Sequence, residues 1–156
     1  MPYTHSLLGG ALWAAVFAAL IGLVTKSRTG ALIGGAVVLS HWFVDLIVHV
    51  PDLTLWGTAP KLGLGLWNYP AIAMPLELGL TFGALIYYLM KTRATGRQSR
   101  LAVGALTLFL LTVQVVNWFG PPPTEPDAAA AITVFGVYGV AALLAAWVGA
   151  TRRRTA

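Results

Sequence analysis

The chain has 156 residues, of which 58% are hydrophobic and only 10% are charged. Soluble domains usually carry about 25% charged residues, so this composition excludes an ordinary water-soluble domain and indicates an integral membrane protein. The length suits one domain, and we expect a single all-α transmembrane bundle over residues 1–156. The chain contains no cysteine, which excludes disulfides, thiolate metal sites and cysteine nucleophiles.

Apolar runs of the chain are long enough to form about five transmembrane helices. A bilayer core about 30 Å thick takes about 20 helical residues, and lipid requires that backbone polar groups be satisfied within each helix. The predicted helices cover residues 7–24, 31–50, 71–90, 101–120 and 128–150. The connection 51–70 is long for a loop in a bundle and is rich in tryptophan and tyrosine. Connections of this length are often functional, and we expect this one to lie on the outer membrane surface as a lid.

Basic residues set the orientation of these helices. The net charge of +5 is concentrated in short segments between apolar runs, so we expect it to orient the chain in a membrane rather than to bind nucleic acid. Nine of the ten basic residues fall in segments that five spans place on one face: Lys26, Arg28, Lys91, Arg93, Arg97, Arg100, Arg152, Arg153 and Arg154. The positive-inside rule makes that face cytoplasmic. We therefore predict an outside N-terminus, a cytoplasmic C-terminus, and Lys61 as the sole basic residue on the outer side.

The same topology gathers every acidic residue and every histidine in the outer half of the bundle. These residues are His5, His41, Asp45, His49, Asp52, Glu77, Glu125 and Asp127. We expect Glu125 and Asp127 to be solvated, with Asp127 capping the fifth helix. The other six are candidates for a functional site.

Three of the candidates recur at a helical spacing. His41, Asp45 and His49 are four residues apart, so successive members lie about 6 Å apart on one face of the second predicted helix. The two histidines are about 12 Å apart along the axis, too far for one ion. A single ion would therefore take Asp45 with one histidine and recruit ligands from other segments. The recruits we expect are His5, Asp52 and Glu77.

Histidine and carboxylate ligands suit zinc first, and also manganese or iron. We therefore predict a divalent metal cofactor, with zinc preferred. A catalytic zinc keeps one position open for water and lowers the pKa of that water to about 7. An uncoordinated carboxylate then serves as general base, and the catalytic candidates are Glu77 and Asp45. In the long connection, Lys61, Trp67 and Asn68 are the predicted substrate-binding residues, with Lys61 placed to meet a phosphate.

A structural polar network is the alternative to a metal site. An ionised carboxylate inside a membrane costs several kcal/mol and is usually paired or functional. None of the predicted spans contains a lysine or arginine that would pair with Asp45 or Glu77. This absence favours a metal or proton-handling site, and the structural network stays open.

The segment THSLLG, with His5 four residues before Gly9, is followed by SHWFVD, with His41 four residues before Asp45. This pair of motifs resembles the small bacterial inner-membrane proteins known as membrane-bound metal-dependent hydrolases, and the resemblance covers roughly the first 55 residues. It implies metal-assisted hydrolysis, of lipid phosphoesters for example, in a bacterial inner membrane. The LPDxD and HRGxTHS segments of that family are missing, and Pro51-Asp52 is the nearest remnant.

These features favour a membrane-embedded, metal-dependent hydrolase that acts on a lipid-like substrate at the outer leaflet. One alternative is a small transporter or channel subunit for metal ions or protons. Such a pathway needs polar residues in the cytoplasmic half as well, where only scattered ones such as Thr107, Tyr87 and Tyr88 occur. Another is a non-catalytic membrane binding or assembly module. The expected partner is membrane lipid, and self-association into a homo-oligomer stays open.

Overall fold

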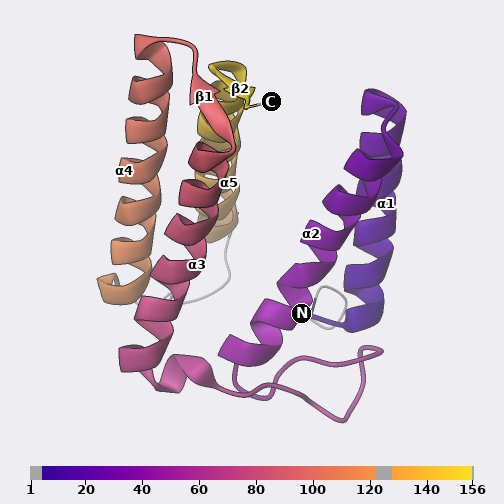
Figure 1. Cartoon of the computed structure of the whole chain (residues 1–156). Coiled ribbons are helices and arrows are strands. Elements are labelled where there is room, and N and C mark those ends of the chain that lie inside the picture. Colours follow the sequence, from indigo (N-terminus) through magenta and orange to yellow (C-terminus); the bar gives the residue numbers. More distant parts are fainter. Residues whose placement is uncertain (1–4, 122–127, 156) are drawn as a thin grey trace. The chain divides into compact units, whose positions relative to one another are not determined.

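The computed structural model describes residues 5–121 and 128–155. All the predicted helices are present there: α1 (Leu7–Thr25), α2 (Arg28–Val48), α3 (Pro70–Met90), α4 (Arg97–Phe119) and α5 (Ala128–Ala150) (Figure 1). Within this part of the chain, five helices are long and apolar enough to cross a membrane. This confirms the mostly helical fold and is consistent with a multi-pass membrane protein. The capping role predicted for Asp127, and the solvated position of Glu125, fall outside the described residues.

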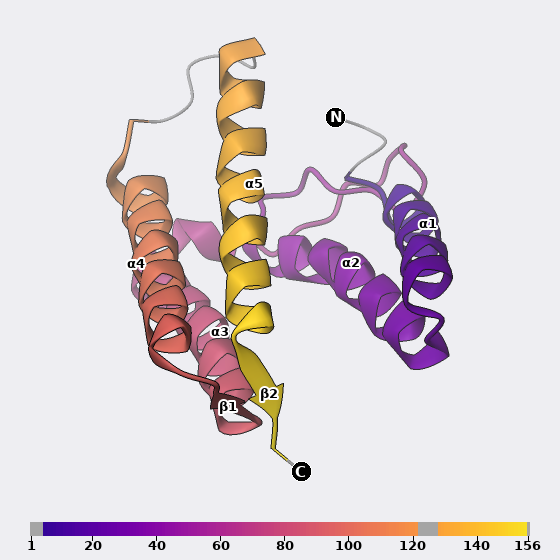
Figure 2. The same ribbon diagram turned by 90° about the horizontal axis from the view of Figure 1, so that it is seen from above.

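The chain divides into two compact units, and the boundary falls inside α3, between Thr81 and Phe82. In the first unit, α1 and α2 lie side by side as an antiparallel hairpin (Figures 1 and 2). Ser6 and Ser27 cap the two helices, because each hydroxyl oxygen accepts a backbone N–H three residues on, at 3.0 Å. Lys26 adopts the left-handed conformation that closes α1, so the turn between the helices is tight.

Small residues let the two helices of this hairpin approach closely. A Cβ atom added at Gly35 would lie 3.0 Å from the Cβ of Ala18 and 3.1 Å from the carbonyl oxygen of Ala14. Trp42, on the same helix as Gly35, is buried. Close backbone approach over glycine and alanine is the usual basis of helix association in lipid, where no hydrophobic effect drives helices together.

The connection 51–70 is folded onto this hairpin and is more structured than the predicted lid. Leu53 pairs with Leu62 through two backbone hydrogen bonds, and the side chain of Leu53 is fully buried. Thr54 donates its N–H to the carbonyl of His5 and accepts the N–H of Leu7, both at 3.0 Å. A short 3-10 helix, η1 (Leu66–Asn68), then leads into α3. The start of α1 is therefore tied to this connection.

The bounds of α2 and α4 differ from the predicted ones by a few residues, and α2 begins at Arg28 rather than at residue 31. Helix α2 ends at Val48 rather than Val50, and His49 is its extended C-cap with φ −73° and ψ 151°. The residue before a proline is biased away from helical geometry, and Pro51 places that bias on Val50. In the second unit, α4 begins at Arg97, so Arg97 and Arg100 belong to its first turns rather than to a loop.

The second unit contains a short two-stranded sheet that the sequence did not predict. β1 (Thr92–Ala94) follows α3, β2 (Arg152–Arg154) follows α5, and the strands pair antiparallel (Figure 2). The guanidinium of Arg152 donates to the hydroxyl of Thr92 at 2.7 Å, to the hydroxyl of Ser99 at 3.2 Å, and to the carbonyls of Leu89 and Thr92. Arg152 thereby joins the ends of α3, α4 and α5. Below it lies a small apolar core, centred on Ala102, Leu106 and Val148.

We predict that Gly35→Ala destabilises the α1–α2 hairpin by about 1–3 kcal/mol, because the added methyl group enters a space that is already filled. Gly79→Ala is the matched control, since a Cβ atom at Gly79 would have no neighbour within 4 Å in the described structure. The control should be neutral or mildly stabilising, because alanine loses less backbone entropy than glycine in a helix. Unfolding midpoints in detergent measure both, and equal midpoints for the two variants would contradict this packing.

Candidate metal centre

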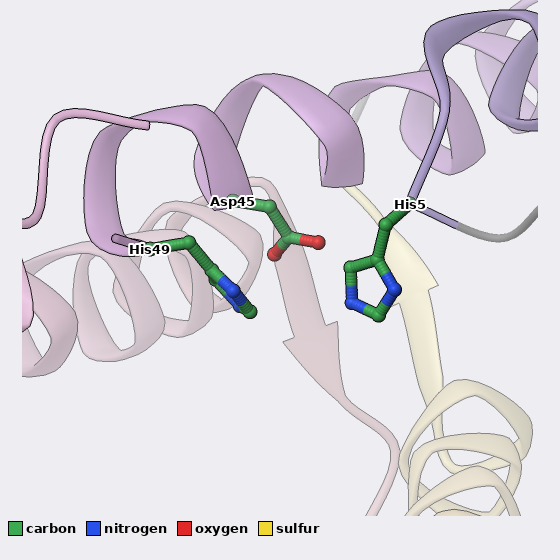
Figure 3. Close-up of side chains that lie close together, drawn as sticks. All are labelled: His5, Asp45 and His49. Atoms are coloured by element: carbon green, nitrogen blue, oxygen red, sulfur yellow. The ribbon is translucent and has the colours of Figure 1, made fainter. Parts of the chain in front are cut away.

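His5, Asp45 and His49 converge at the end of α2. Each offers one potential ligand atom, and these atoms all lie within 4.8 Å of one another (Figure 3). Asp45 belongs to the last turn of α2, His49 caps that helix, and His5 lies two residues before α1. The carboxyl group of Asp45 is buried, and both histidines are half-buried. Two imidazoles and one carboxylate form a donor set that suits zinc, manganese or iron.

Backbone hydrogen bonds hold the three residues in place. The carbonyl of His5 accepts the N–H of Thr54 at 3.0 Å, and the carbonyl of His49 accepts the N–H of Gly65 at 2.7 Å. Gly63 lies against the carbonyls of His49 and Val50, where a Cβ atom would collide with both. The connection 51–70 therefore contacts both histidine-bearing segments, and only glycine at position 63 permits this approach.

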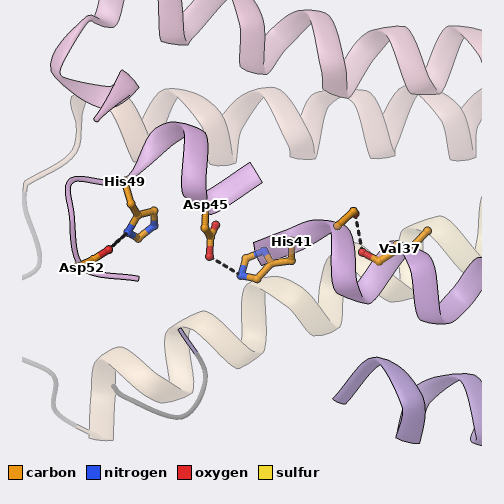
Figure 4. A network of polar contacts seen from close by, with 6 residues as sticks. Val37, His41, Asp45, His49 and Asp52 are labelled. Carbon is orange, nitrogen blue, oxygen red and sulfur yellow. Dashed lines mark hydrogen bonds and ion pairs between the residues drawn. The ribbon is translucent and has the colours of Figure 1, made fainter. Parts of the chain in front are cut away.

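Two of the three candidate ligands also have a polar partner on their outer side. Nε2 of His41 lies 3.1 Å from one carboxylate oxygen of Asp45, and Nδ1 of His49 lies 3.3 Å from the carboxylate of Asp52 (Figure 4). In each contact one polar atom of the inner residue is used, and that residue, Asp45 or His49, has a second polar atom. Metal-binding histidines and carboxylates characteristically have such partners, which fix their orientation.

The contacts inside the cluster are not hydrogen bonds. Among the described residues, no hydrogen bond or ion pair joins His5 to Asp45 or to His49. The rings of the two histidines are 5.6 Å apart between centroids and tilted by 52°. Ligands at 2.0–2.2 Å from a tetrahedral zinc stand roughly 3.5 Å from one another. The three potential ligand atoms, all within 4.8 Å of one another, are therefore near the separation that one shared ion requires.

Glu77 lies beyond Trp67 and outside the three-residue group. The indole Nε1 of Trp67 donates to Oε1 of Glu77 at 2.7 Å. The indole ring also contacts the imidazole of His49, with centroids 4.6 Å apart and planes tilted by 39°. Trp67 thus connects Glu77 to the cluster. The sequence predicted Trp67 only as a substrate-binding residue. Its contacts with His49 and Glu77 had no signal in the sequence.

The other predicted site residues lie around the cluster rather than in it. His41 and Asp52 contact Asp45 and His49 from outside, as described above. Lys61 and Asn68 are exposed on the connection 51–70. The structure therefore brings together His5, Asp45 and His49 from the predicted ligand set, and places Glu77, His41 and Asp52 next to them.

An apolar cavity of about 460 Å³ begins at the residue that follows His5. Its lining runs along one face of α1 and includes one residue of the long connection: Ser6, Leu8, Gly9, Leu12, Trp13, Val16 and Trp56. Its volume is within the range of pockets that bind small molecules, about 300–1,000 Å³. Its walls suit an apolar chain, since they consist of aliphatic and aromatic side chains apart from Gly9 and the hydroxyl of Ser6.

The chain matches no protein-family model, and neither a curated protein nor a solved structure matches it. Fold and site together define a helical protein that has five helices apolar enough to cross a membrane and a histidine–carboxylate cluster at the end of one of them, within the part of the chain that the structure describes.

We predict that the purified protein binds about one zinc ion per chain, and that His5→Ala, Asp45→Ala or His49→Ala each abolishes this binding, since each removes one of three ligands. His41→Ala should weaken binding about 10–100-fold, the usual effect of losing an outer partner. Elemental analysis and zinc titration measure both effects.

All three histidines of the chain lie in or beside the cluster, so the control is a carboxylate. Glu125→Ala, at a position that the sequence places in a solvated loop, should bind zinc like the unmodified protein. Zinc retained in full by Asp45→Ala would refute this centre.

Proposed function

We propose that the protein is a membrane-embedded, metal-dependent hydrolase that acts on a lipid-like substrate at the outer leaflet of a bacterial inner membrane. The observation that supports the proposal is that His5, Asp45 and His49 each offer a potential ligand atom within 4.8 Å of the other two, and that Asp45 and His49 each have a further polar partner, His41 or Asp52. The resemblance to membrane-bound metal-dependent hydrolases supports the same reaction class.

In this proposal, His5, Asp45 and His49 hold a divalent metal, and His41 and Asp52 orient two of these ligands. A metal held by three protein ligands supplies an acidified water and polarises the bond to be cleaved. Glu77 is the general base, because its carboxylate is not one of the three clustered ligands and is held by the indole N–H of Trp67. Trp67 is a positioning residue that contacts both Glu77 and His49.

A lipid-like substrate is supported by the surroundings of the cluster. The apolar cavity along α1 begins beside His5 and has Trp13 and Trp56 in its walls. Tryptophan is enriched where membrane meets water, so an acyl chain in the cavity would present its polar end at the membrane surface. Lys61 and Asn68, both exposed on the connection 51–70, are the proposed contacts for a phosphate or ester head.

We predict that the connection 51–70 faces the outside and the turn before α4 faces the cytoplasm, since nine of the ten basic residues then lie inside. Thr58→Cys and Gln98→Cys place single cysteines at exposed residues of a chain that has none. A membrane-impermeant thiol reagent should label Thr58→Cys in intact cells, and Gln98→Cys only after permeabilisation. Labelling of both from one side would refute the five-span orientation.

We predict that Glu77→Gln retains zinc but lowers turnover by about 100-fold or more, because a carboxamide keeps the shape of the side chain and accepts no proton at neutral pH. Trp67→Phe keeps the ring against His49 and removes the indole donor, so turnover should fall by about tenfold. The measurements are zinc content and hydrolysis of a panel of lipid phosphates and esters.

Glu125→Gln is the matched control, the same chemical change outside the proposed site, and should leave turnover unchanged. Zinc lost from Glu77→Gln would make Glu77 a ligand, and unchanged zinc with unchanged turnover would remove it from the site. Absence of hydrolysis by the unmodified protein, with metal or proton flux into liposomes, would replace the hydrolase by the transporter.

A further inference from the structure

The second unit carries a concentration of positive charge near the ends of its helices. Its basic residues all lie where α3 ends, α4 begins and α5 ends: Lys91, Arg93, Arg97, Arg100, Arg152, Arg153 and Arg154. In the described part of this unit, residues 82–121 and 128–155, there is no aspartate or glutamate. Within these described residues the basic side chains therefore have no carboxylate of their own unit as a counter-charge.

The fold brings these charges closer together. Antiparallel pairing of β1 with β2 sets Arg93 directly opposite Arg153, and like charges in that position destabilise a sheet. Arg97 and Arg100 lie in the first turns of α4, where the helix dipole adds further positive potential. Arg152 alone has its charge surrounded by protein acceptors. The other basic side chains together create a positive electrostatic potential, and this potential favours the binding of an anion.

A cavity of about 410 Å³ opens among these residues, lined by Tyr87, Tyr88, Lys91, Thr92, Arg154 and Thr155. It is a built feature, because backbone hydrogen bonds join its two sides. Thr155 donates both its N–H, at 3.1 Å, and its hydroxyl, at 3.0 Å, to the carbonyl of Lys91.

The two cations of this cavity are available to a ligand. The ammonium of Lys91 lies 5.7 Å from the centroid of the Tyr87 ring. Within the described residues, neither that ammonium nor the guanidinium of Arg154 makes a hydrogen bond or an ion pair. An arginine, a lysine and tyrosine hydroxyls form a donor set that suits a phosphate group.

We propose that this cavity binds the phosphate of an anionic phospholipid, at a site distinct from the metal centre. The α3 surface that leads to the cavity is exposed and apolar, with Ile86 56% and Met90 72% exposed, and it would contact the acyl chains. Tyr87, also exposed, is of a residue type enriched at the level of lipid headgroups. Basic pockets between the ends of membrane helices are suited to anionic headgroups. A dissolved phosphate shares the headgroup chemistry but makes no use of this apolar surface.

The test uses the purified full chain in detergent, with phosphatidylglycerol, phosphatidylcholine and inorganic phosphate as separate probes. Native mass spectrometry and titration measure binding. The unmodified protein should prefer phosphatidylglycerol to phosphatidylcholine. The double variant Lys91→Gln/Arg154→Gln should bind phosphatidylglycerol about 30-fold more weakly, the effect expected from removing two cations near a membrane surface. Lys91→Arg/Arg154→Lys, which keeps both charges, should retain most of the binding.

Lys26→Gln/Arg28→Gln is the matched control, because it removes the same charge at the turn between α1 and α2. This control should keep the lipid preference. Equal losses in the two glutamine variants would show charge attraction without a site and overturn the proposal. Saturable binding of inorganic phosphate with no lipid preference would overturn it as well. If the double variant fails to fold, as judged by its unfolding midpoint, each single glutamine variant replaces it, with an expected loss of about fivefold.

Discussion

The carboxylate of Asp45 is the charge on which the first unit of the structure depends. It is buried to 8% exposure in a helix that is apolar enough to cross a membrane, and an ionised group there costs several kcal/mol unless it is compensated. The side chains around it that can compensate are three histidines, one on the same helix face, one at the helix end and one before α1. An arginine or lysine would have compensated the charge by simple pairing. Histidines compensate it when they are protonated or when they share a cation with it, and the second case is the proposed metal centre.

Backbone geometry, rather than side-chain attraction, brings His5 to this carboxylate. The connection 51–70 pairs with residues 5–8 through the backbone of Thr54 and Leu55, and it contacts the end of α2 through Leu64 and Gly65. These hydrogen bonds do not depend on an ion, so the site is largely preformed. Preformed sites lose less entropy on binding than sites that the ligand must assemble. The same connection supplies Trp67, so one segment both positions a ligand and holds the proposed base.

Apolar runs and their spacing were enough to predict all five helices, and the i, i+4 relation of His41 to Asp45 survives in the structure as a direct contact. The expectation that Asp45 needs ligands from other segments led to His5. Two further features depended on contacts that no local pattern encodes. His49 is the extended C-cap of α2 rather than a residue inside the helix, and its imidazole lies beside that of His5. Trp67 meets Glu77 across ten residues of sequence because η1 turns the chain before α3. The strands β1 and β2 are too short and too basic to be predicted from sequence.

A structural polar network and a metal centre make different demands on these side chains. A network is stable when its buried donors and acceptors bond directly to one another. Here the direct bonds run outward, from Asp45 to His41 and from His49 to Asp52, whereas the inward atoms of His5, Asp45 and His49 approach within 4.8 Å without bonding. A network would place its best contacts at the buried centre and leave the exposed rim to water. The observed arrangement is the reverse, because the direct contacts lie at the exposed rim and the three inner side chains do not bond to one another. That is the arrangement expected when the central partner is a cation held by all three residues.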